Sequence, residues 1–508
     1  MKRFKLVGTK NIFKIIGIVT AINLASRLFG FAREMLIGYH FGTSSLADSV
    51  ILAYTIPNFL YLVLGGAITT AFISIYNKIS NPLHQTQFKE VIFTYITIGT
   101  TVLTIGFMLS ADQIINLFFD GLGESEARIT SSLFVLMTPS LLFLILSMWL
   151  SGVLNVSDRF FSSSLATLTN NFVFVALALI FFPLLGIFAY GWGAVFGALF
   201  MVVVLVYYIV RNKLFRFRLR FRYEETEHLL RMVKIGLPIL LGGATLQLYF
   251  LLHRIFASEL ETGFVAALNY SAKLVQLPQS ILMTAVTTVI YPLLAKKAAQ
   301  KQHQEISSIY FKGINSLILL LAPISIYVYF YAEEIVKLVF EYGSFTEKST
   351  TITAGLLKIF VLGMCAHAAN LYVTRFYYAM ERSIFPVVTG VIAVFGVNVL
   401  IIMLFIGNYG AYAIASATTI SSYFQLISLV IGSIFMLKLK VGNIQYLLKV
   451  VLFILLLIPS MYLTKTFLAP AFSLINLLIG VVVLGIITAL LLKVLHLGEL
   501  NIRRKRKK

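Results

Sequence analysis

The sequence of 508 residues is poor in cysteine, in charged residues and in the motifs of enzymes. Its one cysteine, Cys365, excludes an internal disulfide framework and any multi-cysteine metal site. Its seven histidines include no pair at ligand spacing, and no phosphate-cradling glycine loop is present. The sequence therefore predicts no catalytic residues, no metal, no other cofactor and no direct ATP-driven pump.

Long apolar runs take the place of those features. Hydrophobic residues make up 59% of the chain and charged residues 12%, which is typical of a polytopic membrane protein. The runs exceed the roughly 10 residues of a membrane β-strand, so they predict an all-α protein with about fourteen transmembrane helices. Their predicted limits are 12–38, 46–76, 88–110, 130–155, 161–183, 187–210, 230–256, 264–294, 309–331, 351–378, 385–406, 411–436, 445–464 and 471–492. Prolines inside these ranges predict kinks at Pro57, Pro139, Pro238, Pro278 and Pro323.

The charges are distributed unevenly along the chain. The net charge is +21, yet the loops predicted to face outward hold only Arg128, Lys348 and Lys465 as cations. The positive-inside rule therefore predicts that both termini are cytoplasmic. Because the cations flank membrane spans, anionic membrane lipids account for them better than nucleic acid does. The run Leu214–Arg222 alternates apolar and basic residues, which fits a segment on the inner leaflet surface, a short ribbon or a simple topology anchor.

One pattern occurs twice, 221 residues apart. Its first copy is Arg33, Gly42, Asp48 and Pro57, and its second copy, with identical gaps, is Arg254, Gly263, Asn269 and Pro278. Duplicated helical halves with a site between them are typical of transporters. The sequence therefore predicts two related halves.

Charged residues inside the predicted spans are the candidate functional residues, because such groups are costly in lipid and usually face a bundle interior. Arg27 should point inward, since it lies about 22 Å along its helix, whereas Arg254 could instead extend toward Glu259 and Glu261. Six residues separate Arg27 from Arg33, so the two share a cavity only if the helix bends, and Gly30 is the candidate hinge. The candidates are Arg27, Arg33, Glu34, Asp48, His253, Arg254 and Lys273, with the roles of Lys358 and Arg375 left open.

These motifs resemble a known family. The run Ser26–Glu34, followed by Phe41-Gly42, Ala47-Asp48 and Pro57-Asn58, is similar to the opening of the bacterial MurJ/MviN lipid II flippases, in the multidrug/oligosaccharidyl-lipid/polysaccharide exporter superfamily. The later motifs that match are Asn269–Leu274 with Pro278, Tyr342–Thr346, and Arg375–Ala379 with Pro386.

The resemblance implies two six-helix lobes around a central cavity, with a final helix pair forming a groove for a lipid tail. The expected parts are an N-terminal lobe over 1–211, a basic cytoplasmic linker over 212–229, a C-terminal lobe over 230–440, and a helix pair with a basic tail over 441–508. It assigns Arg27, Arg33 and Lys273, with Arg254 as a further cation, to the pyrophosphate and head group. Glu34 and Asp48 would be their charge partners, and Gly30, Pro57 and Pro278 the hinges. The chain departs from the family at Lys273, which is usually arginine, and after Asn58, where an arginine pair is common.

The function that this resemblance implies is the flipping of lipid II, an undecaprenyl-diphosphate-linked precursor, to the outer leaflet of the bacterial cytoplasmic membrane. The membrane potential would favour outward movement of the anionic cargo, and monovalent ion coupling stays open. The alternatives are a flippase for another undecaprenyl-linked glycan (teichoic acid, capsule or exopolysaccharide), a multidrug or cation antiporter, and a membrane scaffold for cell-wall enzymes. Cell-wall synthesis or division proteins are the expected protein partners, and no nucleic acid is expected.

Overall fold

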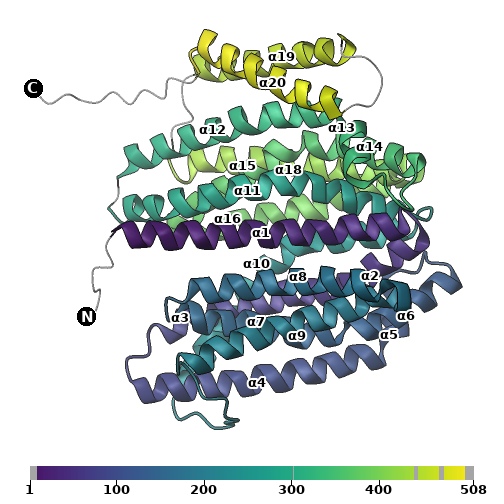
Figure 1. The fold of residues 1–508 in the computed structure, drawn as a ribbon. Helices are drawn as coiled ribbons and strands as arrows, with labels where there is room; N and C mark the ends of the chain where they lie inside the picture. The colour runs from purple at the N-terminus through teal and green to yellow at the C-terminus, as the bar shows by residue number, and fades with distance from the viewer. Residues whose placement is uncertain (1–8, 301, 440–443, 468–473, 498–508) are drawn as a thin grey trace, which may run out of the picture. The chain divides into compact units, whose positions relative to one another are not determined.

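The computed structural model describes residues 9–300, 302–439, 444–467 and 474–497, and every regular element in these ranges is a helix (Figure 1). Helix occurs in each of the fourteen predicted ranges. Nine of the described helices are long and apolar enough to cross a membrane, and up to twelve spans result if each of three bent pairs is one span. The long helices α1 (Thr9–Phe41) and α11 (Phe264–Ala299) cover the first and eighth predicted ranges and extend beyond them. The prediction of an all-helical polytopic membrane protein is confirmed.

The chain divides into two compact units, Met1–Ala266 and Ala267–Lys508. The remaining elements of the first unit are α2 (Ser45–Leu60), the π-helical turn η1 (Tyr61–Gly65), α3 (Gly66–Tyr76), α4 (Pro82–Leu109), α5 (Ala111–Phe118), α6 (Glu124–Met137), α7 (Pro139–Asn155), α8 (Phe160–Leu185), α9 (Phe188–Arg211) and α10 (Thr226–Ser258). In the second unit, after α11, are α12 (His303–Phe330), α13 (Ala332–Phe340), α14 (Glu347–Leu362), α15 (Met364–Ala379), α16 (Ile384–Val391), the π-helical η2 (Ile392–Asn398), α17 (Val399–Tyr409), α18 (Ala411–Phe435), α19 (Ile444–Phe467) and α20 (Leu474–Val494).

The boundary between the units differs from the predicted linker at 212–229. It falls at Ala266 because α10 packs on α2, η1 and α3 of the first unit. The first unit therefore holds the first six predicted spans and also the seventh. The predicted basic tail at 503–508 lies outside the described residues.

The backbone repeats in the two halves. Helices α4 and α12 each have 28 residues, and their first residues lie 221 positions apart in the sequence. Left-handed backbone conformations recur at matching places in the chain, which reflects the same turns in both halves. The matching pairs are Gly42 with Gly263, Asp158 with Glu381, Gly186 with Gly410, and Lys213 with Lys438. The duplication seen in one motif thus extends through all six helical spans of each half.

Two matching spans are broken at their midpoints. The α6–α7 pair bends by 40° at Thr138, and the α14–α15 pair bends by 42° at Gly363. The first bend confirms the kink predicted at Pro139, since proline removes a helical hydrogen bond. At Gly363, any Cβ would lie 3.2 Å from the Thr419 backbone, so glycine permits close packing on α18.

The other predicted kinks differ from the structure. The segments Thr226–Ala244 and Gln247–Ser258 of α10 meet at 42°, so this bend lies beyond Pro238. Pro57 precedes the π-helical turn η1, where Gly65 lets Met148 of α7 approach closely. Helices α11 and α12 continue through Pro278 and Pro323 without a break. Helix α1 is likewise continuous through Gly30.

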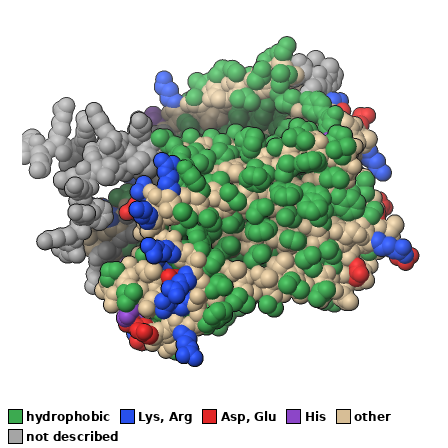
Figure 2. Space-filling view, turned by 60° about the horizontal axis from the view of Figure 1, so that its bottom comes forward, with side chains coloured by type: hydrophobic (Ala, Val, Ile, Leu, Met, Phe, Trp, Pro, Cys, Tyr) green, Lys and Arg blue, Asp and Glu red, His purple; other side chains and the backbone are tan. Residues whose placement is uncertain are grey.

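The interior of the first unit is aromatic. Trp149 of α7 is fully buried and packs against Phe72, Phe93 and Phe215. By contrast, large apolar side chains such as Val102 and Leu109 of α4 are mostly exposed, as expected of helices surrounded by lipid. Figure 2 shows a face on which hydrophobic side chains form a broad field, with Lys and Arg gathered along one edge. This surface fits a helical protein embedded in a bilayer.

Candidate substrate site

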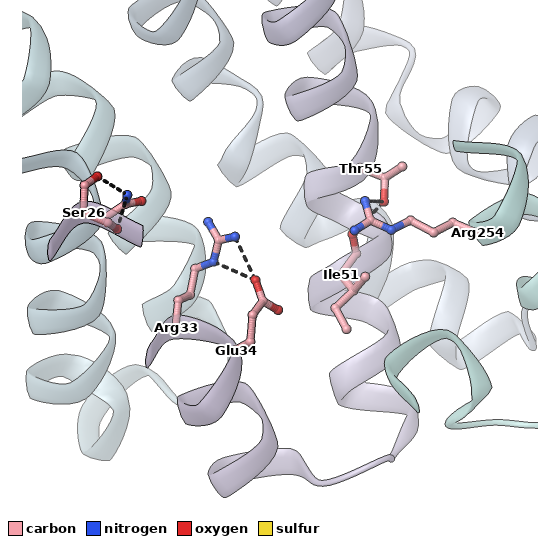
Figure 3. Close-up of polar contacts among 7 residues, drawn as sticks. Ser26, Arg33, Glu34, Ile51, Thr55 and Arg254 are labelled. Carbon is pink, nitrogen blue, oxygen red and sulfur yellow. Dashed lines mark hydrogen bonds and ion pairs between the residues drawn. The ribbon is translucent and has the colours of Figure 1, made fainter. Parts of the chain in front are cut away.

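The centre of the candidate site is an ion pair on α1. Arg33 donates from Nη2 to Glu34 Oε1 over 2.8 Å and from Nε to the same oxygen over 3.2 Å (Figure 3). The Glu34 side chain is only 4% exposed, whereas that of Arg33 is 20% exposed. The pair therefore keeps a buried carboxylate satisfied while part of the guanidinium stays accessible.

Two aromatic rings hold the Arg33 guanidinium in place. Its Cζ atom lies 5.3 Å from the ring centre of Tyr54 on α2 and 5.1 Å from that of Phe174 on α8. Both distances fall within the range of cation–π attraction. Helix α8 is itself fixed to α1 by Asn171, whose amide donates to the Ser26 carbonyl and hydroxyl oxygens, each over 2.9 Å. Arg33 is thus a positioned cation with two ring faces as walls.

A second arginine comes from α10. Arg254 Nη1 donates to the Thr55 hydroxyl over 2.9 Å, and that hydroxyl donates to the Ile51 carbonyl over 2.7 Å (Figure 3). The charges of Glu34 and of Arg33 both act on Arg254. Arg254 therefore points toward α2 and the Arg33–Glu34 pair, and not toward the acidic loop at its own helix end.

These three ionised groups carry one excess positive charge, because they comprise two guanidinium groups and one carboxylate. Each guanidinium presents a planar fork of N–H donors that suits phosphate or carboxylate oxygens. The described geometry of the first unit therefore brings guanidinium donors from α1 and α10 beside α2 and α8, an arrangement whose chemistry suits an anion.

Asp48 lies elsewhere and has backbone partners. Its carboxylate accepts hydrogen bonds from the Gly263 N–H over 2.6 Å and from the Ala266 N–H over 2.7 Å. These amides lie at the start of α11, where free N–H groups and the helix dipole favour a negative charge. We call this interaction the Asp48 cap. Its described contacts do not support the predicted role of Asp48 as a charge partner of the cations.

The chain packs closely around the Asp48 cap. Gly263 has φ +96°, and a Cβ there would lie 2.2 Å from the Thr43 carbonyl oxygen. A Cβ on Gly121 would lie 2.4 Å from the Ser258 carbonyl oxygen, so the loop before α6 lies directly against the end of α10. Nearby, burial and the Asp120 carboxylate raise the pKa of Glu259. These backbone contacts join the start of α11 to the turn before α2, and the end of α10 to the loop before α6.

The other predicted residues are more dispersed. Arg27 is exposed and lies on an unbroken helix, about 120° around from Arg33, so the structure does not bring these two arginines together. Lys273, Lys358 and Arg375 belong to the second unit, where each is partly buried. The predicted hinges at Gly30 and Pro278 gain no support from the unbroken α1 and α11.

Two residues near the cations were absent from the sequence prediction. Thr55 binds Arg254, and Tyr54 packs on Arg33. A threonine or tyrosine in an apolar run has no periodic signal that distinguishes a ligand from a packing residue. Their positions six and seven residues after Asp48, on the helix next to α1, were the one available indication.

Comparison with known proteins identifies the family. Residues 37–494 match the family model described as lipid II flippase MurJ. The chain belongs to the MurJ family. This is a family of membrane transporters of peptidoglycan biosynthesis and not of enzymes, which confirms the resemblance seen in the sequence motifs.

Relatives and solved structures agree with this assignment. A probable lipid II flippase MurJ of Rhizobium meliloti is 29% identical over 418 residues, covering 80% of this chain and 77% of the relative. The lipid II flippase MurJ of Burkholderia cenocepacia is 26% identical, covering 70% of each chain. In fold, the chain is similar to a lipid II flippase MurJ in an inward closed conformation, with a TM-score of 0.81, 22% identity and coverage of 94% of this chain and 99% of that one. An inward-facing MATE family transporter gives 0.70 at 13% identity, covering 83% and 99%.

Proposed function

We propose that this MurJ family member moves lipid II from the inner to the outer leaflet of the bacterial cytoplasmic membrane. The observation that supports this cargo most directly is that two arginines, Arg33 paired with Glu34 and Arg254 bonded to Thr55, come from α1 and α10 to the same part of the first unit. A diphosphate offers several oxygens to such donors. Charge-assisted hydrogen bonds of this type are about twice as strong as neutral ones.

Binding would proceed by exchange of partners at Arg33. In the described state Glu34 occupies one side of the guanidinium, while the rest of the side chain remains partly exposed. An incoming diphosphate oxygen would bind N–H groups of Arg33 and Arg254, displacing Glu34 from Arg33, and Glu34 would return when the cargo leaves. We propose that Arg27 and Lys273 add further cations along the path of the head group. Lys273 would act as a point charge because it lacks the guanidinium fork.

The transport cycle would be alternating access, with the lipid tail remaining in the bilayer. In the proposed orientation both termini are cytoplasmic and the Asp48 cap faces outward. The cap would hold the start of α11 against α2 while the site is open inward, and it would break when the site opens outward. Outward movement of roughly two negative charges is favoured by about 2.3 kcal/mol per charge for each 100 mV of interior-negative potential.

Growth complementation tests the proposed cargo. A strain depleted of its own lipid II flippase should grow when it expresses this chain, and should not grow with Arg33→Ala at equal membrane abundance. Arg231→Ala is the matched control, because Arg231 is an exposed arginine whose ion pair with Glu227 lies far along α10. Failure of the intact chain to support growth, with normal export of another undecaprenyl-linked glycan, would overturn lipid II as the cargo.

A further inference from the structure

The linker between α9 and α10, residues 212–225, has a surface that the proposed transport cycle does not use. It forms neither helix nor strand, yet its course is fixed by α4. Lys89 Nζ donates to the Leu214 carbonyl over 2.6 Å, and the Arg220 N–H donates to the Thr94 hydroxyl over 2.9 Å. Further along, the Tyr95 hydroxyl donates to the Phe221 carbonyl over 3.2 Å. The linker is therefore attached to α4 at several successive points.

Side chains reinforce this attachment. Phe215 is 5% exposed and packs on Phe93 and Trp149. Arg220 donates to Glu90 over 2.8 Å, and the Glu90 side chain is only 8% exposed. At the end of the linker, Glu225 pairs with His84 Nδ1 over 2.7 Å, which joins it to the start of α4. A segment held in this way presents its remaining side chains at defined positions.

The linker lies at the level where α4 becomes apolar. Lys89 and Glu90 are the last charged residues of α4, and from Val91 to Leu109 the helix contains none. The linker contacts Phe93, Thr94 and Tyr95, which begin this uncharged stretch. In a bilayer, we expect a segment at this level to lie at the boundary between head groups and acyl chains.

The exposed side chains of the linker suit both the polar head groups and the apolar acyl chains. Phe217 is 37% exposed, Leu219 59% and Phe221 61%. Between and beside them in sequence are the exposed arginines Arg216, Arg218 and Arg222, and none of the described carboxylates forms an ion pair with these three. The one carboxylate that the linker does contact on α4, Glu90, is already paired with Arg220. The surface is thus apolar and cationic at once.

We propose that this linker surface binds the head groups of anionic phospholipids in the inner leaflet. Arg216, Arg218 and Arg222 would bind the phosphates, and Phe217, Leu219 and Phe221 would enter the acyl region. The proposal rests on the cytoplasmic orientation of the linker, and it is independent of which lipid the protein transports. A soluble polyanion would satisfy the arginines but would leave three large apolar side chains in water.

Binding of phosphatidylglycerol to the full-length protein tests the proposal. Native mass spectrometry of the purified protein measures the apparent affinity for phosphatidylglycerol and, separately, for phosphatidylcholine. The variant Arg216→Gln/Arg218→Gln/Arg222→Gln should lower the phosphatidylglycerol affinity by about tenfold or more, since anionic lipids attract each of these cations. The control Lys78→Gln/Arg159→Gln/Arg231→Gln makes the same change in net charge at exposed sites outside the linker. The control should retain most of the affinity.

Two further measurements do not depend on the arginine variant. Raising the salt concentration should weaken phosphatidylglycerol binding to the unaltered chain, and Phe217→Ser/Leu219→Ser/Phe221→Ser should weaken it at constant charge. Equal affinity for phosphatidylcholine, retention of full affinity by the triple arginine variant, or complete competition by inorganic pyrophosphate would each overturn the proposal. The last result would instead indicate a site for a soluble anion.

Discussion

Asp48 and Gly263 are joined by a hydrogen bond of 2.6 Å, from the backbone N–H of Gly263 to the carboxylate of Asp48. The two residues come from different copies of the duplicated motif, Asp48 from the first and Gly263 from the second. The duplication therefore supplies both the carboxylate and the left-handed glycine turn that exposes an amide to it. In the proposed transport cycle this contact must break.

Weakening the Asp48 cap should change the hydrogen exchange of the Gly263 and Ala266 backbone amides. Asp48→Asn removes the negative charge and leaves a single side-chain oxygen that can accept a hydrogen bond. Hydrogen bonds to charged groups contribute about 1.5–3 kcal/mol to stability. Hydrogen exchange in a peptide that spans Gly263 and Ala266 should therefore accelerate by about tenfold or more. Asp112→Asn is the control, because Asp112 is bonded to the Ser131 hydroxyl instead. Unchanged exchange in Asp48→Asn would show that the cap does not protect these amides.

A side chain at Gly263 should disrupt the same region by a different route. Gly263→Ala places a Cβ 2.2 Å from the Thr43 carbonyl oxygen at φ +96°, so the chain must shift. We expect a lower melting temperature and loss of growth complementation. Gly99→Ala is the matched control, since a Cβ at that position in α4 meets no atom within 4 Å. That helical substitution should be neutral or slightly stabilising.

Removing the carboxylate from the candidate site should strengthen anion binding. Glu34→Gln raises the excess charge of the Arg33, Arg254 and Glu34 group from one to two. We expect the affinity for undecaprenyl diphosphate to rise by about tenfold, which corresponds to about 1.4 kcal/mol. Flipping should nevertheless slow, because release becomes harder. Binding to the purified, folded protein gives the test, with the exposed Glu124→Gln as control. Weaker binding by Glu34→Gln would contradict the site.

We expect the titration of the Glu259 carboxyl group to make the stability of the protein depend slightly on pH. Its pKa is raised above the usual 4.5, so the folded protein holds this proton more tightly than the unfolded chain does. The corresponding stability is complete below about pH 4.5 and is lost as the pH rises through the raised pKa. Melting temperatures of the intact chain and of Glu259→Gln should therefore diverge across this range. The effect should be small, because Glu259 is exposed and screened by solvent. Parallel pH curves for the two proteins would exclude this contribution.

Much of the fold could be predicted because lipid imposes simple rules on a sequence. Apolar runs set the helices, and the motif spacing paired Gly42 with Gly263. The structure shows that both have left-handed backbone conformations. The bend at Pro139 could be predicted as well, since proline removes a hydrogen bond. The matching bend at Gly363 could not, because a glycine in a helix gives no signal until the approach of Thr419 is known.

The site was only partly predictable, because side-chain partners depend on which helices meet. Sequence identified Arg33, Glu34 and Arg254 as charges in lipid, but it left open whether Arg254 faced the acidic loop or the helix bundle. Its bond to Thr55 comes from the packing of α10 on α2, which no local pattern reports. Similarly, the family resemblance implied that Asp48 is a charge partner of the cations, and only the fold shows that its carboxylate caps α11.

The most direct test of the account is the appearance of lipid II on the outer surface of cells. A membrane-impermeant reagent that modifies outer-leaflet lipid II measures this in a strain depleted of its own flippase. The intact chain should restore surface lipid II, and Arg231→Gln should match it, while Arg33→Gln and Arg254→Gln should each reduce it at least tenfold at equal abundance. Full restoration by Arg33→Gln and Arg254→Gln would contradict an anion site at these arginines.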